Sequence, residues 1–310
     1  MPLFDAYIFV DWSARNRLGP AQPTADAIWV GELERGSRTR ESYFRTRSQS
    51  CAFLEQRLLE LLGKSYRVLV GFDFPYGYPH GFASCLSSRS DKGPWLLVWE
   101  TLSNLVVDKD DNTSNRFEVA AGINKNIGAK RRGPFWGCPA GRRLPGMKPR
   151  SPGFPFVAYD DLKLSRLRIS EARLPGVQES WKLLGIGSVG SQALLGIPRV
   201  YRLRTHEGLS QHSMVWPFET GFSSSVSPAS GPFILHAEIW PGIVKQEVAA
   251  MIRLRRNMIR DQAQVRCLCE WARNLDRAGQ LARFFERPTG LTDMEAQLCD
   301  SDEGWILGGS

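Results

Sequence analysis

Length, composition and charge limit what this chain can be. It has 310 residues, 42% hydrophobic and 23% charged, which is typical of globular proteins and unlike disordered or fibrous chains. Forty lysines and arginines against 32 acids give a formal net charge of +8, which favours anionic partners such as nucleic acid or nucleotides. No apolar run is long enough to span a bilayer and no secretion signal is present, so we expect a cytoplasmic protein that does not bind membranes.

The six cysteines and four histidines form no metal-binding pattern. The only closely spaced cysteines, Cys267 and Cys269, lack the C-x-x-C spacing of zinc sites. No H-E-x-x-H or H-x-x-x-H pattern places two imidazole rings on one helical face. We therefore expect reduced, mostly buried thiols and no histidine-based zinc site.

The first 75 residues predict a compact α/β unit. Apolar runs predict three antiparallel strands at 7–13, 27–33 and 41–47. Residues 50–63 have the apolar spacing of an amphipathic helix that ends at a glycine. The apolar run at 67–74 follows this helix, and a right-handed crossover would place it parallel to the first strand.

Two of these strands end on an aspartate, and this is the most informative feature of the sequence. Asp11 closes the run YIFVD and Asp73 closes RVLVGFD. Open α/β sheets place their sites at the carboxyl ends of parallel strands, and a buried acid is costly unless it is paired. We expect the two carboxylates to be neighbours with a divalent metal as their partner.

The middle of the chain is basic and rich in glycine and proline. A helix is expected at 91–107 and a polar break at 108–115, after which 119–150 carries eight basic residues and no acid. We interpret 108–175 as a basic insertion within a single domain spanning 1–310.

This stretch is the strongest candidate for a nucleic-acid contact. Basic side chains release counterions from phosphates, and an exposed aromatic ring can stack on an unpaired base. The alternative is a solvated loop whose Phe135 and Trp136 plug the core beneath it. The candidate substrate-binding residues are Lys130, Arg131, Arg132, Phe135, Trp136, Arg142 and Arg143.

A G-x-G-x-x-G match follows at Gly185, Gly187 and Gly190. A dinucleotide site would require a buried strand directly before it and an acid at the end of the next strand. Glu207 lies at the right distance, but the preceding segment reads poorly as a strand and Ser188 looks like the start of a helix. We favour tight packing or a helix that lines the substrate.

Two further acids occupy informative positions. Glu238 interrupts the apolar strand FILHAEIW, and pairing with an arginine is the alternative to metal binding. Residues 243–258 are helical and basic, with Arg253, Arg255 and Arg256 clustered. Asp261 opens the next helix, as either an N-terminal cap or a metal ligand. The acids of the tail are expected to be mostly solvated; they are Glu295, Asp300, Asp302 and Glu303.

These motifs resemble a predicted nuclease family of unknown function with an RNase H-like fold. The resemblance rests on Asp11 in FVDWSA, the D-x-P-x-G-x-P turn from Asp73, Glu238 in E-x-x-P, and a late helical Asp261. It covers both ends of the chain, but 80–230 only loosely. It implies an α/β fold in which helices flank a mixed sheet of three antiparallel strands followed by parallel strands.

The function expected from these residues is metal-dependent hydrolysis of phosphodiester bonds in DNA or RNA. Clustered carboxylates can hold two Mg²⁺ or Mn²⁺ ions about 4 Å apart. On this hypothesis Asp11, Asp73, Glu238 and Asp261 are both the catalytic and the metal-binding residues. The alternative is a noncatalytic RNase H-like module that binds nucleic acid or a protein.

Overall fold

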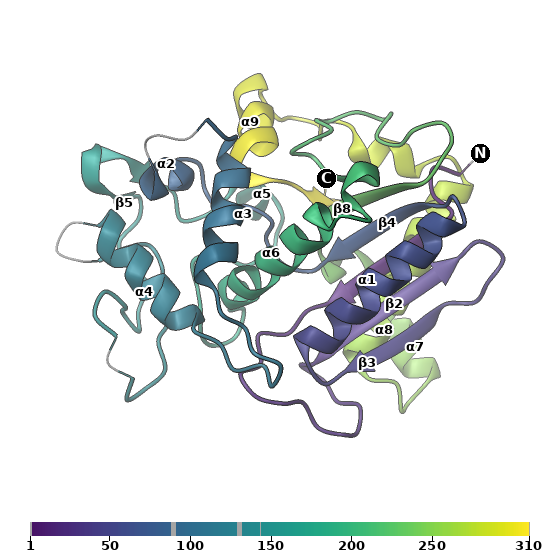
Figure 1. Ribbon diagram of the computed structural model, residues 1–310, viewed down its shortest axis with the longest axis horizontal. Coiled ribbons are helices and arrows are strands. Elements are labelled where there is room, and N and C mark those ends of the chain that lie inside the picture. Colours follow the sequence, from purple (N-terminus) through teal and green to yellow (C-terminus); the bar gives the residue numbers. More distant parts are fainter. Residues whose placement is uncertain (1, 88–90, 129–131, 143, 310) are drawn as a thin grey trace.

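The computed structural model describes residues 2–87, 91–128, 132–142 and 144–309. Their centre is a twisted mixed sheet crossed by long helices (Figure 1). The strands of this sheet are β1 (Ala6–Asp11), β2 (Ile28–Glu34), β3 (Arg40–Phe44), β4 (Arg67–Phe72), β7 (Ser213–Val215), β8 (Phe233–Ile239) and β9 (Ile306–Leu307). Their order is β3-β2-β1-β4-β8-β7, and β9 pairs with the end of β8. A separate two-stranded sheet joins β5 (Phe156–Val157) and β6 (Lys163–Leu164).

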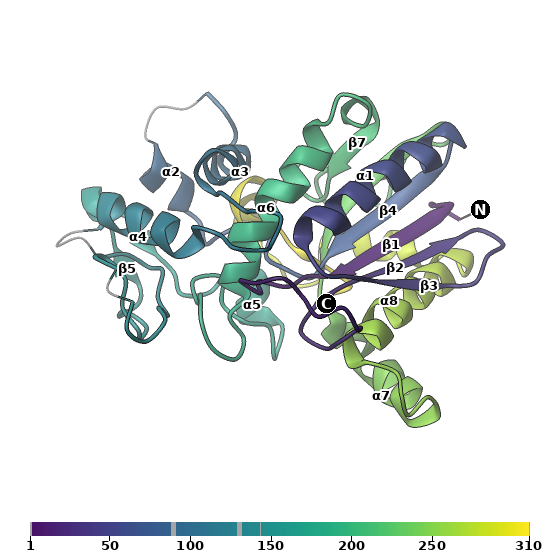
Figure 2. The same cartoon turned by 60° about the horizontal axis from the view of Figure 1, so that its bottom comes forward.

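Helices cover both faces of the sheet, and none in the described part of the chain is long and apolar enough to cross a membrane. They are α1 (Arg47–Gly63), α2 (Phe82–Leu86), α3 (Pro94–Leu105), α4 (Arg116–Ile127), α5 (Ile169–Arg173), α6 (Val189–Thr205), α7 (Lys245–Leu254), α8 (Arg260–Arg277) and α9 (Asp293–Leu298). Figure 2 shows α1 and α6 on one side of the sheet and α7 and α8 on the other. The architecture is therefore α/β, as the sequence predicts.

The first half of the sheet confirms the predicted connections. β1, β2 and β3 pair antiparallel, and β4 returns parallel to β1 after α1. The Thr46 side chain caps α1 by accepting from the Gln49 amide, so the helix begins three residues earlier than Ser50 suggested. β1 and β4 lie inside the sheet and are covered on both faces, which explains their nearly unbroken apolar sequences.

Alternation along the strands decides which side chains share a face. In β1, Ile8 and Val10 belong to the core on the α1 side, whereas Tyr7 and Phe9 belong to the core on the α8 side. The register pairs Val10 with Phe72, so the next residues, Asp11 and Asp73, come opposite each other. Both aspartate side chains therefore face the α8 side of the sheet.

The α8 helix lies close against the first two strands. Gly31 of β2 permits this approach, because a Cβ atom there would lie only 2.7 Å from the Val265 carbonyl oxygen. The first turn of α8 thereby reaches the carboxyl end of β1, where Asp11 lies.

The middle of the chain packs onto the same core as the α1 side of the sheet. Figure 1 shows α4 and β5 beyond α3 and α6, at the end of the molecule away from β3. Helix α4 was not predicted; its buried side chains include Phe117, Ala120 and Ile123, and this apolar pattern overlaps the start of the basic stretch. The tail also differs from expectation, because Asp302 and Glu303 are buried.

Candidate functional site

Asp11 and Asp73 lie side by side at the carboxyl edge of the sheet. Asp11 is the last residue of β1, and Asp73 follows the last residue of β4. The Asp73 backbone amide donates to the Val10 carbonyl at 3.2 Å, and the Asp73 carboxylate accepts from the Trp12 amide at 2.6 Å. These two hydrogen bonds tie the strand ends together and hold the Asp73 side chain beside β1.

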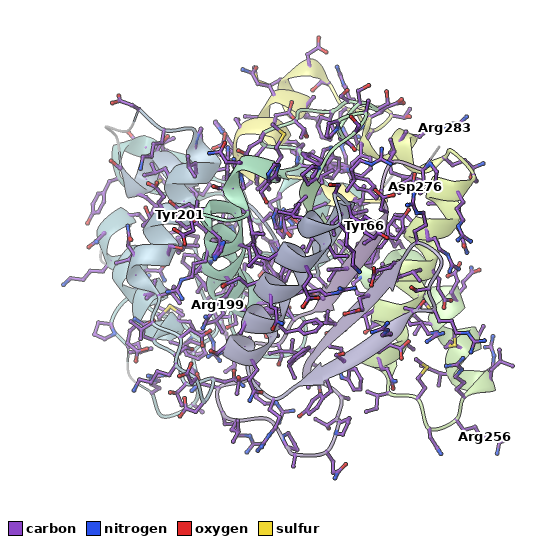
Figure 3. The ribbon with its side chains drawn as sticks, turned by 45° about the vertical axis from the view of Figure 1, so that its right-hand side comes forward. Tyr66, Arg199, Tyr201, Arg256, Asp276 and Arg283 are labelled. Atoms are coloured by element: carbon purple, nitrogen blue, oxygen red, sulfur yellow. The ribbon has the colours of Figure 1, made fainter. Side chains whose placement is uncertain are left out.

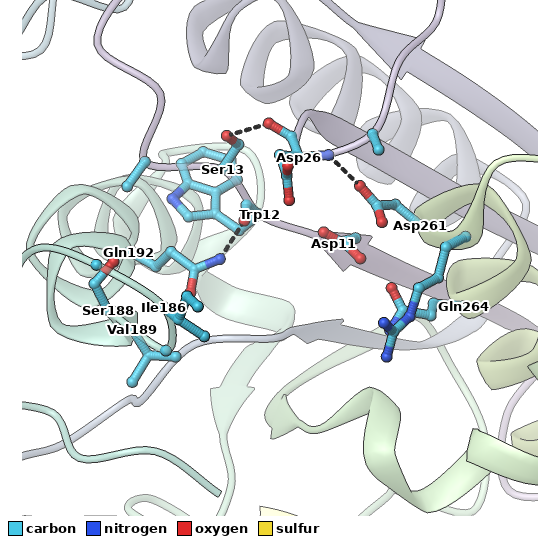
Figure 4. A pocket seen from close by; sticks show the side chains of 15 residues that line it. Asp11, Trp12, Ser13, Asp26, Ile186, Ser188, Val189, Gln192, Asp261 and Gln264 are labelled. Atoms are coloured by element: carbon cyan, nitrogen blue, oxygen red, sulfur yellow. Dashed lines mark hydrogen bonds between the residues drawn. The ribbon is translucent and has the colours of Figure 1, made fainter.

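Helix α8 adds a third carboxylate to this edge. Asp261 is buried, and its Oδ2 accepts a hydrogen bond from the Asp26 backbone amide at 2.7 Å (Figure 4). It is not the N-cap of α8, which is Ile259. Asp261 therefore fastens the neighbouring loop instead of capping its own helix, and it projects to the same side of β1 as Asp11.

Asp26 is a fourth carboxylate that sequence analysis did not single out. Its backbone has φ = 53°, a left-handed conformation that non-glycine residues rarely adopt. The Ser13 hydroxyl donates to the Asp26 carbonyl at 3.0 Å and helps to hold this turn. In Figure 4 the Asp26 side chain lies beside Asp11 and Asp261.

Three of the carboxylates, Asp11, Asp73 and Asp261, have raised pKa values. Burial raises the pKa of Asp11 well above its usual value, and the charges of Asp73, Asp261 and Asp26 raise it further. Burial also raises the pKa of Asp73 to about 7, with a contribution from Asp261. The pKa of Asp261 is raised by burial too, although the amide of Asp26 opposes this.

No cation neutralises the cluster within the described part of the chain. Arg260 lowers the pKa of Asp11 and Asp261 from nearby, but it forms no ion pair with either carboxylate. Among the described residues, the Asp11 side chain forms no hydrogen bond or ion pair. A group of acids in this state is costly in the folded protein unless a cation or a proton joins it.

Three of the acids, Asp11, Asp26 and Asp261, line a pocket of about 580 Å³, a size that suits a small ligand or a single nucleotide unit, whereas Asp73 is not part of its lining. One wall carries Asp11, Asp26 and Asp261, and the opposite wall is the loop before α6. The wall facing the acids consists of Gly185, Ile186, Gly187, Ser188, Val189 and Gln192. Arg260 and Gln264 of α8 also line the pocket.

The donor set fits a hard divalent cation in its chemistry. The pocket is lined by the carboxylates of Asp11, Asp26 and Asp261, which is the ligand type that Mg²⁺ and Mn²⁺ prefer. Among residues 2–87, 91–128, 132–142 and 144–309, no three acidic, histidine or cysteine side chains are already close enough to hold an ion together. Ion binding would therefore require the carboxylates to move closer together than they are here.

Glu238 is separated from this cluster. The register places it level with Phe72, so it projects to the α1 side of the sheet, away from Asp11 and Asp73. Arg168 binds both of its oxygens, at 2.8 and 2.6 Å, and the Tyr76 amide donates to it at 2.9 Å. Glu238 was expected either to bind a metal or to pair with an arginine, and its contacts match the pairing.

Arg168 is the centre of a second buried charge cluster. Its fully buried guanidinium contacts Glu238, Glu171 at 2.7 Å and the Glu303 carbonyl at 2.8 Å. The Glu303 carboxylate accepts from the amides of His80 and Ile169, which explains its burial in the tail. This cluster fixes the turn after Asp73 against the C-terminal segment.

The G-x-G-x-x-G match does not form a dinucleotide fold. The residues before it form no strand, although Ser188 is the N-cap of α6 as predicted. Gly185 and Gly187 adopt positive φ values of 94° and 72°, and Ile186 between them is 97% exposed at the pocket rim. The motif thus builds a loop that lines the acidic pocket.

The aromatic pair of the basic stretch has structural contacts. Phe135 is buried against Tyr78, Phe82 and Trp181, so it is a core residue and not a base-stacking surface. The Trp136 indole donates to Glu179 at 2.7 Å, with Lys182 over its ring. This corrects the expected role of Phe135 and matches the alternative in which the pair plugs the core.

The basic residues of this stretch are dispersed. Arg142 pairs with Glu118, and Arg132 lines a separate pocket with Lys148 and Arg150. Neither Arg132 nor Arg142 lines the acidic pocket. The remaining candidates, Lys130, Arg131 and Arg143, lie outside the described residues.

No protein-family model matches this chain, and neither a curated protein nor a solved structure is similar enough to match it. What the acidic pocket does must therefore be inferred from its own residues and their geometry.

Proposed function

We propose that this protein is a metal-dependent phosphodiesterase that acts on nucleic acid from an RNase H-like fold. One observation carries the proposal: Asp11, Asp73 and Asp261 converge at one edge of the sheet, with raised pKa values and no ion pair to a basic side chain among the described residues. Such perturbed acids in a pocket are typical of functional sites. Structural acids of the same chain, such as Glu238, are paired instead.

The order of the strands supports the RNase H-like assignment. Three antiparallel strands precede a parallel one, and the two aspartates end neighbouring parallel strands. This is the arrangement that the resemblance of the motifs implies. We assign the metal to Asp11, Asp73 and Asp261, with Asp26 beside them, and leave Glu238 in a structural role.

The residues of the pocket suggest how such a reaction would proceed. A divalent cation held there would polarise a phosphoryl oxygen and favour deprotonation of an attacking water. Arg260 and Gln264 lie where they can donate hydrogen bonds to phosphate oxygens, and Ile186 offers an apolar edge to a base or sugar.

The test is cleavage of labelled DNA and RNA, single- and double-stranded, with Mg²⁺ or Mn²⁺. We expect cleavage by the wild type, loss of cleavage in Asp11→Asn, and retention in Asp110→Asn, a matched variant at an exposed aspartate. Calorimetry with Mn²⁺ alone should give binding that Asp11→Asn weakens strongly and Asp110→Asn leaves unchanged. If the wild type neither binds Mn²⁺ nor cleaves any substrate, the proposal is wrong.

A noncatalytic module is the second candidate, and the Arg168–Glu238 pair favours it. That pair removes one carboxylate from the set of four expected to hold two ions. A module of this kind would bind nucleic acid or a protein without cleaving any strand in Mg²⁺ or Mn²⁺. The same cleavage assay therefore separates the two functions.

A further inference from the structure

The turn between α7 and α8 is strongly basic and exposed. Arg253, Arg255 and Arg256 are exposed, as is Arg260 at the start of α8. Leu254 among them is 83% exposed. Within the described part of the chain, no ion pair or side-chain hydrogen bond engages the guanidinium groups of these four arginines. Figure 3 shows Arg256 extending into solvent at the lower edge of the molecule.

Some neighbouring arginines do form ion pairs. On the same helix, Arg266 forms ion pairs with Glu41 and with Glu270. Elsewhere Arg173 pairs with Glu295. Exposed arginines are often merely solvated, but four of them within eight residues repel one another when no acid lies between them. A polyanion would remove that repulsion.

The turn also forms a hollow of about 350 Å³. It is lined by Arg255, Arg256, Asn257, Met258 and Gln262, and no carboxylate is among them. Four of these five side chains can donate hydrogen bonds, which suits phosphate oxygens. The chemistry of this hollow is thus opposite to that of the acidic pocket.

The hollow adjoins the acidic pocket through the first turn of α8. Gln262 lines the hollow, whereas Arg260, Asp261 and Gln264 line the pocket. Arg256 and Arg260 are four residues apart, so their Cα atoms can be at most about 14 Å from each other. At a rise of about 3.4 Å per nucleotide in a duplex strand, this is a distance of a few nucleotides.

We propose that the α7–α8 turn binds backbone phosphates of a nucleic-acid strand that enters the acidic pocket. The substrate is then an oligonucleotide, held through phosphates a few nucleotides from the one at Asp11, and not a mononucleotide. The part of this inference that leads the strand into the acidic pocket rests on the proposed function. Its binding step, however, is independent of cleavage and can be measured without a metal.

The test compares the double variant Arg255→Gln/Arg256→Gln with a control of equal charge change, Arg277→Gln/Arg283→Gln. The control arginines are exposed, and Arg283 lies at the opposite end of this side of the molecule (Figure 3). Binding of fluorescein-labelled 20-mers of dT and of U is measured in EDTA across a range of salt concentrations. Binding of dTMP provides the small-ligand comparison.

Each lost phosphate contact should lower the slope of log affinity against log salt by about 0.7 for a single strand, and affinity at 0.1 M salt by about fivefold. The double variant should therefore bind the 20-mers on the order of 25-fold more weakly, and its preference for a 20-mer over dTMP should shrink. The control pair should bind like the wild type. Equal affinities and slopes for the wild type and the double variant would overturn the proposal.

The outcomes separate this inference from the proposed function. If the wild type cleaves nothing but the double variant loses affinity, the phosphate-binding turn stands and the nuclease does not. If the wild type cleaves and the double variant binds normally, the nuclease proposal stands and the phosphate-binding turn does not. Loss of binding to phosphatidylserine vesicles without loss of 20-mer binding would overturn the proposal in favour of a membrane surface.

Discussion

Replacing Asp73 with asparagine should stabilise the metal-free protein above neutral pH. The pKa of Asp73 is raised from 3.8 to about 7, mainly by burial, so the folded state binds its proton more tightly than the unfolded state. Stability contributed by this group is therefore lost as pH rises from about 4 to about 7, and the full penalty is present above pH 7. An asparagine carries no charge and can still accept the hydrogen bond from the Trp12 amide.

The size of the effect follows from the shift in pKa. About three units at about 1.4 kcal/mol each give an upper limit of about 4 kcal/mol at pH 8. Asp73 is half-buried, so water screens part of its charge, and we expect a gain of about 2 kcal/mol. For 310 residues this corresponds to a rise of about 3 °C in Tm. Below pH 4.5 the gain should fall under about 1 kcal/mol.

The assay is urea denaturation of the wild type and Asp73→Asn in EDTA from pH 4.5 to 8. Asp108→Asn is the matched control, because burial would raise the pKa of Asp108 but hydrogen bonds and charge from Arg47 and Arg199 lower it. That variant should lose about 3–5 kcal/mol, since it leaves the buried Arg47 guanidinium without its charged partner. An Asp73→Asn protein no more stable than the wild type at pH 8 would refute the reasoning.

Three further substitutions test the framework of the site. Arg168→Met should lower the free energy of unfolding by about 3–5 kcal/mol in urea titrations, because Glu238 is left buried without its partner; a loss under 1 kcal/mol would contradict the pairing. Phe135→Ala should cost about 3–5 kcal/mol through the cavity it leaves, and a thermally neutral variant would return this residue to the surface role first expected. Gly31→Ala should cost about 1–3 kcal/mol, because the added Cβ would press on the Val265 carbonyl of α8; unchanged stability would mean that α8 can move away freely.

The sequence was informative where local pattern decides structure. The continuous apolar runs that end on Asp11 and Asp73 identified two parallel strands that are covered on both faces, and the helix between them fixed their adjacency. The start of α6 at Ser188 was likewise visible from local sequence. Helix α4 was missed because its apolar positions run into the basic stretch, where composition drew attention to charge instead of periodicity.

The face of Glu238 could not be predicted for a physical reason. In a strand that alternates apolar and polar residues, the pattern itself reveals which side chains face the core. β8 is buried along its whole length, so its sequence does not reveal which residues face which side of the sheet. Only the register with β4 shows that Glu238 and Asp73 face opposite sides. Its partner, Arg168, is 70 residues away and is one of 40 basic residues.

Asp26 was missed because loops reveal their contacts only in three dimensions. The residue lies in a polar segment between two strands, where an aspartate usually indicates a turn. Its left-handed backbone and the hydrogen bond from its amide to Asp261 distinguish it from an ordinary turn residue. Neither property can be predicted from the sequence.

The acids on the two faces of the central strands have different surroundings. On the α1 side, Glu238 is neutralised by a fully buried arginine, which holds the turn after Asp73 in place. On the α8 side, Asp11 lies near other acids, and no ion pair neutralises it within the described part of the chain. A protein selected only for stability has no reason to keep like charges together at the mouth of a pocket. The cost of the acidic cluster, set against the ion pair on the other face, is therefore the main physical support for the proposal that this edge of the sheet binds a cation.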